Sequence, residues 1–224
     1  MDRMTAWRFL YPPVALLEGI VVDVGGQRRG SEDLYGVRLT EAMITKASAN
    51  GHLILDSTQW AKAKKQLPQQ TSPLVGLQRA GWLYWDYTKA PSLGRLAVKL
   101  GVDSAGLGKT VEPYNDDIVS NKPDEMRKTT ELCTPILKAP FYALDISAQD
   151  PLGIQAVLGL TLGGLRVDED YSLLLIDQDK KISGLYAAGR TAAGVCSNGY
   201  ISGLSLTDGM FSRRRAAEHA LSVA

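Results

Sequence analysis

The chain has 224 residues, of which 45% are apolar and 22% charged, with a formal net charge of +1. This length suits one large domain or two small ones, each with a real core. The near-neutral charge argues against a nucleic-acid-binding protein, which needs a clustered basic excess. Cys133 and Cys196 form no CxxC pattern, and only His52 and His219 could join them, so we expect neither a disulfide framework nor a metal site.

Membrane and targeting signals are absent from the sequence. No apolar run approaches the roughly 18 residues that are needed to cross a bilayer. The N-terminal stretch MDRMTAWRFLYPP lacks the apolar core of a signal peptide. We therefore expect a cytoplasmic protein without a stable membrane span.

Residues 1–148 alternate between strand-like and helix-like patterns, which predicts a mixed α+β region. The expected strands and helices are, in chain order: strand 19–24, helix 37–48, strand 52–56, helix 57–66, helix 92–100, helix 104–115 and strand 139–146. Ser57 or Thr58 is the expected N-cap of the second helix, and Pro68 is its stop. The polar segment 116–138 is predicted to be a loop.

Residues 149–224 have the pattern of an α/β layer. Strands are expected at 161–167 and 171–176, a polar turn at 177–181 and a helix at 205–221. Closely spaced glycines and alanines fill the stretch GLYAAGRTAAGVCSNGYISG at 184–203. Small residues at this density indicate a backbone that passes close to something large and flat, or to another backbone. A strand, a glycine turn and a fresh helix N-terminus also favour electron-rich groups, because the first N–H groups of the helix are free.

Two blocks of this stretch, GLYAAGR at 184–190 and GYISGLSLTDG at 199–209, carry a family resemblance. They resemble the C-terminal flavin-contacting part of the fumarate reductase/succinate dehydrogenase flavoprotein superfamily. Within it they look most like the 3-ketosteroid dehydrogenases of the Δ4-(5α) type. The resemblance implies a FAD-dependent oxidoreductase acting on CH–CH groups. It also implies a substrate-binding (cap) domain at 1–148, followed by the C-terminal segment of a Rossmann-like FAD domain at 149–224.

The N-terminal dinucleotide fingerprint of such an enzyme, G-x-G-x-x-G, is absent from the chain. Gly25-Gly26 with Gly30 has the wrong spacing, and so does Gly163-Gly164. The chain therefore resembles about the C-terminal half of a full enzyme. A missing N-terminal FAD-binding half, supplied upstream or elsewhere, is the partner that this implies, besides a small steroid-like substrate.

Catalytic residues follow from the resemblance by position. The segment GQRRGSEDLYG at 26–36 is similar to the family pattern G-x-R-F-x-N-E-D-x-Y-G, although Arg29 replaces an aromatic residue and Ser31 an asparagine. Carried over, the catalytic set is Tyr35, Tyr200 and Ser202. Tyr35 is favoured as the base, with the other two polarising the substrate ketone, but which tyrosine is the base stays open. The alternative is that these tyrosines and the serine are structural, and that Glu32 and Asp33 form a solvated pair.

The resemblance also implies which residues contact FAD. They are Ala188, Gly189, Arg190, Gly203, Ser205 and Leu206. The backbone near Gly189 would follow the ribityl and pyrimidine side, and the start of the last helix would face flavin O2 and N1, where the helix dipole favours an anionic ring. Arg213 stands where the family has glycine, which indicates either a disturbed contact with the missing flavin domain or a solvated basic face.

The expected reaction is the desaturation of a 3-keto steroid or similar cyclic ketone, with a proton abstracted and a hydride passed to flavin N5. The superfamily's fumarate and succinate enzymes have one arginine near the position of Gly36 and another near that of Tyr200, because bidentate arginines hold dicarboxylates. Neither matched position is an arginine here, and Arg38 lies two places from Gly36, where it could point elsewhere. A non-catalytic remnant is a further alternative. The remotest is a helix-turn-helix DNA-binding unit over 93–107, which the interrupting Gly106 and Gly108 and the neutral charge weaken.

Overall fold

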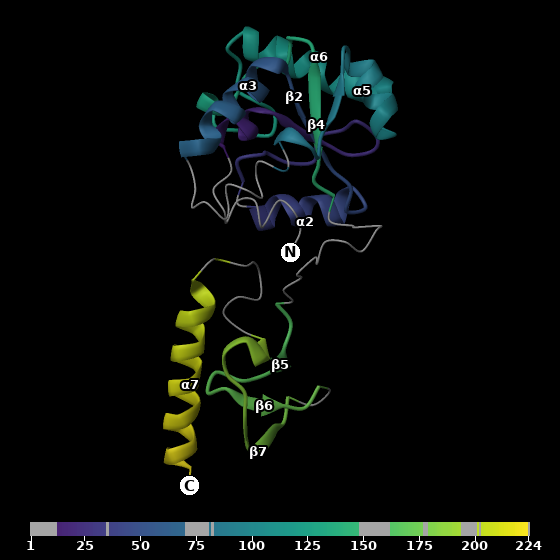
Figure 1. Cartoon of the computed structure of the whole chain (residues 1–224). Coiled ribbons are helices and arrows are strands. Elements are labelled where there is room, and N and C mark those ends of the chain that lie inside the picture. The colour runs from purple at the N-terminus through teal and green to yellow at the C-terminus, as the bar shows by residue number, and fades with distance from the viewer. Residues whose placement is uncertain are drawn as a thin grey trace. The chain divides into compact units, whose positions relative to one another are not determined.

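The computed structural model describes residues 13–34, 36–69, 81, 83–147, 162–176, 179–193, 201 and 203–223. Contacts along the chain divide it into a first unit, Met1–Leu158, and a second unit, Gly159–Ala224 (Figure 1). The predicted domain boundary at 148/149 and the unit boundary at 158/159 both fall outside the described residues.

The first unit is built on an antiparallel sheet with the strand order β1-β2-β4-β3. Its elements, with the short 3-10 helices written η, are η1 (Val14–Glu18), β1 (Ile20–Val22), α2 (Gly36–Lys46), β2 (His52–Leu55), α3 (Ser57–Gln66), η2 (Leu67–Gln69), β3 (Thr88–Ala90), α5 (Leu93–Leu100), α6 (Ser104–Val119), η3 (Thr130–Leu132) and β4 (Phe141–Asp145). The mixed α+β prediction for this region is confirmed.

Helices cover both faces of this sheet, so successive strand residues enter two different cores. Leu53 and Leu55 of β2 pack in a cluster with residues of α2 and α3. Ile54, between them, packs in a second cluster with residues of α5 and α6. Figure 1 shows α2 on the opposite side of the unit from α5 and α6. Burial on both faces explains why β1 and β2 are continuous apolar runs rather than alternating ones.

The turn after β1 lies directly against the start of α6, at a distance that only glycine allows. A Cβ on Gly26 would lie 2.3 Å from the backbone nitrogen of Leu107, and one on Gly106 would lie 2.0 Å from the carbonyl oxygen of Gly25. Thr110 Oγ1 donates a hydrogen bond of 2.6 Å to the carbonyl of Gly26. These glycines therefore hold the α5–α6 hairpin onto the sheet, which is a packing role for the segment that also has the outline of a helix-turn-helix.

Two predictions for the first unit are corrected. The N-cap of α3 is Asp56, not Ser57 or Thr58, because its carboxylate accepts hydrogen bonds from the first turn and Gln59 returns the capping-box bond. Helix α6 continues to Val119, past the predicted end at 115 and into the predicted loop, since Ile118 still packs against the second cluster. Pro68 follows the end of α3, as predicted.

The second unit contains a short parallel strand pair, an antiparallel pair and one long helix. Its elements are β5 (Leu165–Arg166), β6 (Ser172–Leu174), β7 (Lys181–Tyr186), η4 (Gly189–Thr191), β8 (Ala192–Ala193) and α7 (Leu204–Ser222). Strand β5 pairs in parallel with β8, and β6 pairs antiparallel with β7. One small cluster is buried among the described residues, made of Tyr171, Leu173, Ala187, Ala192 and Ala216.

The helix α7 matches its predicted range, but the sequence does not predict the strand that precedes residues 188–190. Lys181–Tyr186 form β7, which begins at the end of the predicted turn 177–181 and runs into the glycine-rich stretch that starts at 184. Gly184 has a positive φ of 73° inside this strand, so its backbone departs from a regular strand where the sequence gives a turn signal. Among the described residues, no helix is both long and apolar enough to cross a membrane.

Candidate functional site

The predicted cofactor residues 188–190 follow β7 and are held against α7. Ala188 has an extended backbone, and Gly189 begins the single turn η4. The N–H of Gly189 donates a 2.7 Å hydrogen bond to Ser212 Oγ, which itself donates 2.6 Å to the carbonyl of Asp208. The backbone at Gly189 therefore passes close to the backbone of α7. Small residues in this stretch predict a close approach either to another backbone or to a large flat group, and this contact is of the first kind.

The residues Ser212 and Asp208 were not singled out from the sequence. They lie four positions apart on α7, so they share one face of the helix, and both are buried. Asp208 Oδ1 has no hydrogen-bond partner within the described part of the chain. The sequence could have indicated them, because Asp208 and Ser212 are a polar pair at i, i+4 on a predicted helix that follows a glycine-rich stretch.

The start of α7 is open on the side of its first turn. Gly203 is the N-cap with φ of 86°, and no side chain caps the helix. A Cβ placed on Gly203 would meet no atom of the described residues within 4 Å. Of the two N–H groups expected to face the flavin, that of Leu206 donates to the carbonyl of Gly203 at 3.2 Å. Within the described part of the chain, this helix N-terminus is uncapped and has free space beside it, which suits an electron-rich group.

The three predicted catalytic residues, Tyr35, Tyr200 and Ser202, lie outside the described residues. Tyr35 belongs to the first unit, whereas the other two belong to the second. The structure therefore brings together the predicted cofactor residues 188–190 with α7, and it does not test the catalytic set. The roles of these three residues stay predictions.

The loop that leads to Tyr35 is described up to Leu34, and it is strongly anchored. Glu32 is buried, so its interpretation as part of a solvated pair is wrong. Asp33 accepts a 2.8 Å hydrogen bond from the N–H of Thr129 and further bonds from the hydroxyls of Ser31 and Thr129. Burial alone would raise the pKa of Asp33, but these hydrogen bonds lower it below its ordinary value, so the carboxylate stays charged.

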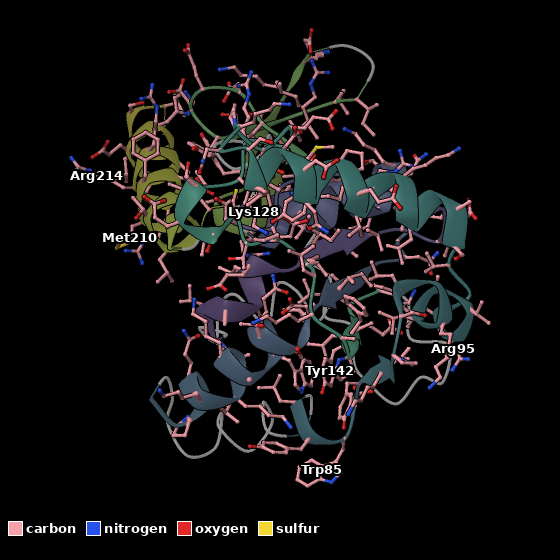
Figure 2. The ribbon with its side chains drawn as sticks, turned by 90° about the horizontal axis from the view of Figure 1, so that it is seen from above. Trp85, Arg95, Lys128, Tyr142, Met210 and Arg214 are labelled. Carbon is pink, nitrogen blue, oxygen red and sulfur yellow. The ribbon has the colours of Figure 1, made fainter. Side chains whose placement is uncertain are left out.

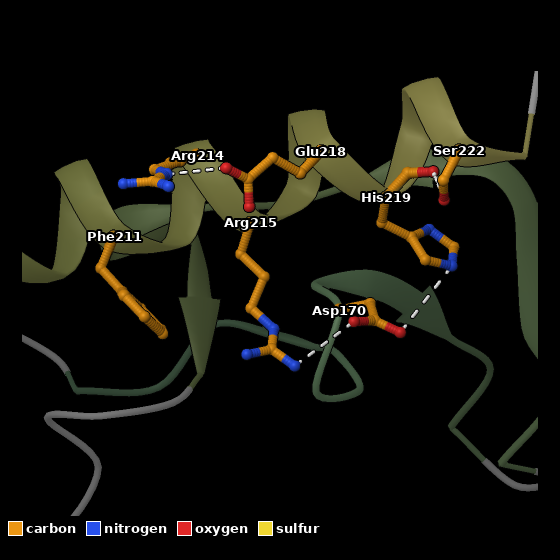
Figure 3. A pocket seen from close by; sticks show the side chains of 7 residues that line it. All are labelled: Asp170, Phe211, Arg214, Arg215, Glu218, His219 and Ser222. Atoms are coloured by element: carbon orange, nitrogen blue, oxygen red, sulfur yellow. Dashed lines mark hydrogen bonds and ion pairs between the residues drawn. The ribbon is translucent and has the colours of Figure 1, made fainter.

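An open pocket of about 480 Å³ lies on the C-terminal half of α7, and none of the predicted site residues lines it. Its lining residues are Asp170, Phe211, Arg214, Arg215, Glu218, His219 and Ser222. Figure 3 shows Arg215 and His219 reaching toward Asp170 from the helix, at 3.6 and 3.8 Å. The lining side chains thus pair mainly with one another. Among the described residues, no group of three His, Cys, Asp or Glu side chains is placed to hold a metal ion.

Comparison with known families decides the assignment. The model of the FAD binding domain family matches residues 15–205. The chain belongs to this family. Its predicted family and FAD as the family's cofactor are thereby confirmed. The described residues fit this cofactor at the start of α7, where the free space beside Gly203 and the uncapped first turn would accept it.

Known relatives include both steroid and fumarate enzymes. The chain is 31% identical over 195 residues to 3-oxo-5-alpha-steroid 4-dehydrogenase of Comamonas testosteroni, covering 84% of this chain and 36% of that protein. It is 27% identical over 206 residues to the probable fumarate reductase Ifc3 of Shewanella frigidimarina, covering 90% and 31%. The chain therefore spans only about a third of the length of these relatives.

A solved structure gives the same result. The 3-ketosteroid-delta4-(5alpha)-dehydrogenase of Rhodococcus jostii RHA1, in complex with 4-androstene-3,17-dione, superposes with a TM-score of 0.72 at 32% identity. The match covers 93% of this chain and 39% of that one. The predicted likeness to the Δ4-(5α) 3-ketosteroid dehydrogenases is confirmed, and so is an FAD-dependent oxidoreductase family with a mixed α/β fold.

Proposed function

We propose that this chain is the substrate domain (1–148) and the C-terminal flavin-domain segment (149–224) of a dehydrogenase that desaturates a 3-keto steroid or similar cyclic ketone. The observation that carries the proposal is the likeness, over 93% of the chain, to a steroid dehydrogenase with a bound steroid ketone. The alternative is a fumarate-type site, which would bind a dicarboxylate through arginines. This chain has Gly36 and Tyr200 at the two positions where such arginines would stand.

The proposed chemistry divides between the cofactor and the chain. When bound, FAD supplies the acceptor for the hydride that leaves the substrate. Tyr35 takes the proton from the carbon next to the ketone, while Tyr200 and Ser202 donate hydrogen bonds to the ketone oxygen as it gains enolate character. One proton and one hydride leave adjacent carbons, so a C=C bond forms and two electrons pass to the flavin.

The flavin would lie at the start of α7, with the backbone of residues 188–190 beside it. The helix contributes its dipole and the N–H groups of its first turn, Ser205 among them, and Gly203 keeps the approach free of a side chain. These groups would bind and orient the cofactor, and the tyrosine rings would shield the reacting carbons from water once substrate is bound.

A dinucleotide-binding half is needed to complete this site. Helix α7 exposes Leu206, Met210 and Phe211 to 75%, 60% and 52%, and Figure 2 shows Met210 pointing outward from its helix. An apolar row of this kind on a helix is normally covered. The chain covers 36% and 39% of its steroid-dehydrogenase relatives, and we propose that an upstream FAD-binding half covers this face.

The test uses the chain joined to that half, with a saturated 3-keto steroid and an artificial electron acceptor. Tyr200→Phe is expected to reduce turnover by about a hundredfold, the usual loss for one donor to a developing oxyanion, with the flavin absorbance unchanged. Tyr186→Phe is the matched control, because the Tyr186 hydroxyl bonds His219 at 2.9 Å and has no proposed role. Full turnover of Tyr200→Phe would remove Tyr200 from the mechanism, and protein without flavin would indicate a remnant.

A further inference from the structure

Four charged side chains meet inside the first unit, away from solvent. The exposed fractions of the side chains of Arg28, Glu32, Asp124 and Lys128 are 6%, 1%, 2% and 0%. Figure 2 labels Lys128 among the ribbons of this unit. Buried ion pairs are often replaceable by apolar residues without loss of stability, so stability alone does not account for such a cluster.

Glu32 is the centre of this charge cluster. It accepts hydrogen bonds from Arg28 Nη2 at 2.8 Å and Nε at 3.2 Å, and from the backbone N–H of Val21 at 2.8 Å. Lys128 Nζ lies 3.3 Å from Glu32 and donates 2.6 Å to the carbonyl of Gly19. The carboxylate therefore ties the loop after β1 both to the strand itself and to a distant loop.

That distant loop, 124–129, is held by a second set of bonds. Asp124 accepts from Arg28 Nη1 at 2.5 Å and from the N–H of Lys128 at 3.1 Å. The bond from Thr129 to Asp33 adds a link at the edge of the cluster. Two loops separated by 96 residues are thus joined through Arg28, Glu32 and Asp33 on one side, and through Asp124, Lys128 and Thr129 on the other.

Hydrogen bonds and neighbouring charges favour the charged forms of Arg28 and Asp124. Burial would raise the pKa of Asp124, but the hydrogen bonds and charge of Arg28, with those of Lys128, lower it below its ordinary value. Burial acts against the charge of Arg28 too, yet Glu32 and Asp124 raise its pKa. Each ion is compensated, so the two loops are held by charge-assisted bonds, which are directional and strong.

We infer that this charge cluster, with the Asp33–Thr129 link, positions the segment that enters α2 and thereby the side chain of Tyr35, two residues after Asp33. The inference rests on the proposed function, in which Tyr35 acts on the substrate. The four cluster residues and Asp33 are positioning residues. They bond to one another and to backbone, and they would act through the backbone that carries the tyrosine.

The test reads Tyr35 directly, in the full chain without cofactor or substrate. With 3-fluorotyrosine at position 35, the ¹⁹F resonance reports the surroundings of that ring. Lys128→Met removes one tie while leaving the Arg28–Glu32 pair, and Asp33→Asn weakens another near the surface. We expect each variant to move the resonance by more than its line width or to split it. Asp117→Asn is the matched control, since Asp117 pairs with Lys122 on the exposed surface, and it should leave the resonance in place.

The resonances of the variants decide the inference, and their activities test its link to the reaction. If both variants fold and their resonances coincide with that of the wild type, the cluster does not position Tyr35. If Lys128→Met fails to fold, the half-buried Asp33→Asn alone decides. In the chain joined to its flavin-binding half, each variant should lower kcat about tenfold to a hundredfold at unchanged flavin content, because small misplacements of a reacting group have effects of that size. A moved resonance together with full activity of Tyr35→Phe would keep the positioning and reject the proposed base.

Discussion

The two units of the chain differ in how fully they bury their own apolar surface. The first unit encloses its sheet between two clusters, with Ile54 and Leu96 entirely buried in one of them. The second unit has one small cluster, while its long helix α7 leaves Leu206 and Met210 largely exposed. A closed core supports independent folding. An exposed apolar helix face indicates that another protein segment covers it in the complete fold. The first unit therefore has the closed core expected of a domain, and we propose that the second unit is part of a larger one.

The largest difference is expected when the two units are expressed separately and their thermal unfolding is compared. Residues 13–147 expressed alone should unfold in one cooperative thermal transition, because both faces of their sheet are covered. Residues 159–224 alone should show no cooperative transition, since their small core cannot offset the entropy of ordering the chain. Circular dichroism melts, with amide dispersion in NMR spectra, measure this. A sharp transition for the shorter fragment would refute the comparison.

Within the first unit, the core residue Ile54 should matter most. Ile54→Ala removes a fully buried side chain from the sheet centre, and we expect a loss of about 2–5 kcal/mol in the free energy of unfolding. Ile44→Ala is the matched control, since that side chain is 54% exposed and should change stability by less than about 0.5 kcal/mol. Urea denaturation measures both. Equal effects of the two variants would mean that the described burial is incorrect.

The helix starts sharpen the contrast between the units. Asp56 caps α3 with its side chain and also accepts from the N–H groups of Leu137 and Lys138, whereas the start of α7 at Gly203 has no side-chain cap. Asp56→Ala should cost about 1–2 kcal/mol. Ser57→Ala should stay within about 0.5 kcal/mol, because Ser57 lies inside the helix. A larger loss of stability for Ser57→Ala than for Asp56→Ala would support Ser57 as the N-cap, as the sequence alone predicts.

These residues also show what the sequence could and could not reveal. The sequence pattern located β2, α3 and α7 closely, because β2 is a short buried run and each of the two helices has a face that repeats at the helical period. Asp56 was missed because the predicted strand 52–56 includes it, whereas β2 ends at Leu55 and Asp56 is the N-cap of the next helix. The burial of Glu32 was missed because its partner Lys128 is far away in sequence. Family blocks suggested Tyr35, and no local pattern distinguishes it from other tyrosines.

The smallest expected effect concerns the two histidines, one in each unit. His52 is buried on β2, and its Nδ1 has no hydrogen-bond partner within the described part of the chain. Burial lowers the pKa of His52 below its ordinary value, and the nearby carboxylate of Asp145 only partly opposes this. In the unfolded chain the ring keeps an ordinary pKa of about 6.5. The unfolded state therefore binds more protons as the pH falls below that value, and the folded state loses stability there.

The contribution of the neutral His52 ring to the free energy of unfolding is therefore fully present above about pH 6.5. It disappears as the pH falls toward the pKa of His52 in the folded state. We expect the urea midpoint of the first unit to decrease between pH 7 and pH 5 in the wild type. His52→Gln has no titrating ring, so its midpoint should change less over the same interval. His219→Gln, in the second unit, should keep the wild-type dependence, because His219 contacts Tyr186 and Asp170 rather than this core. The same pH dependence in His52→Gln as in the wild type would assign the acid sensitivity to other groups.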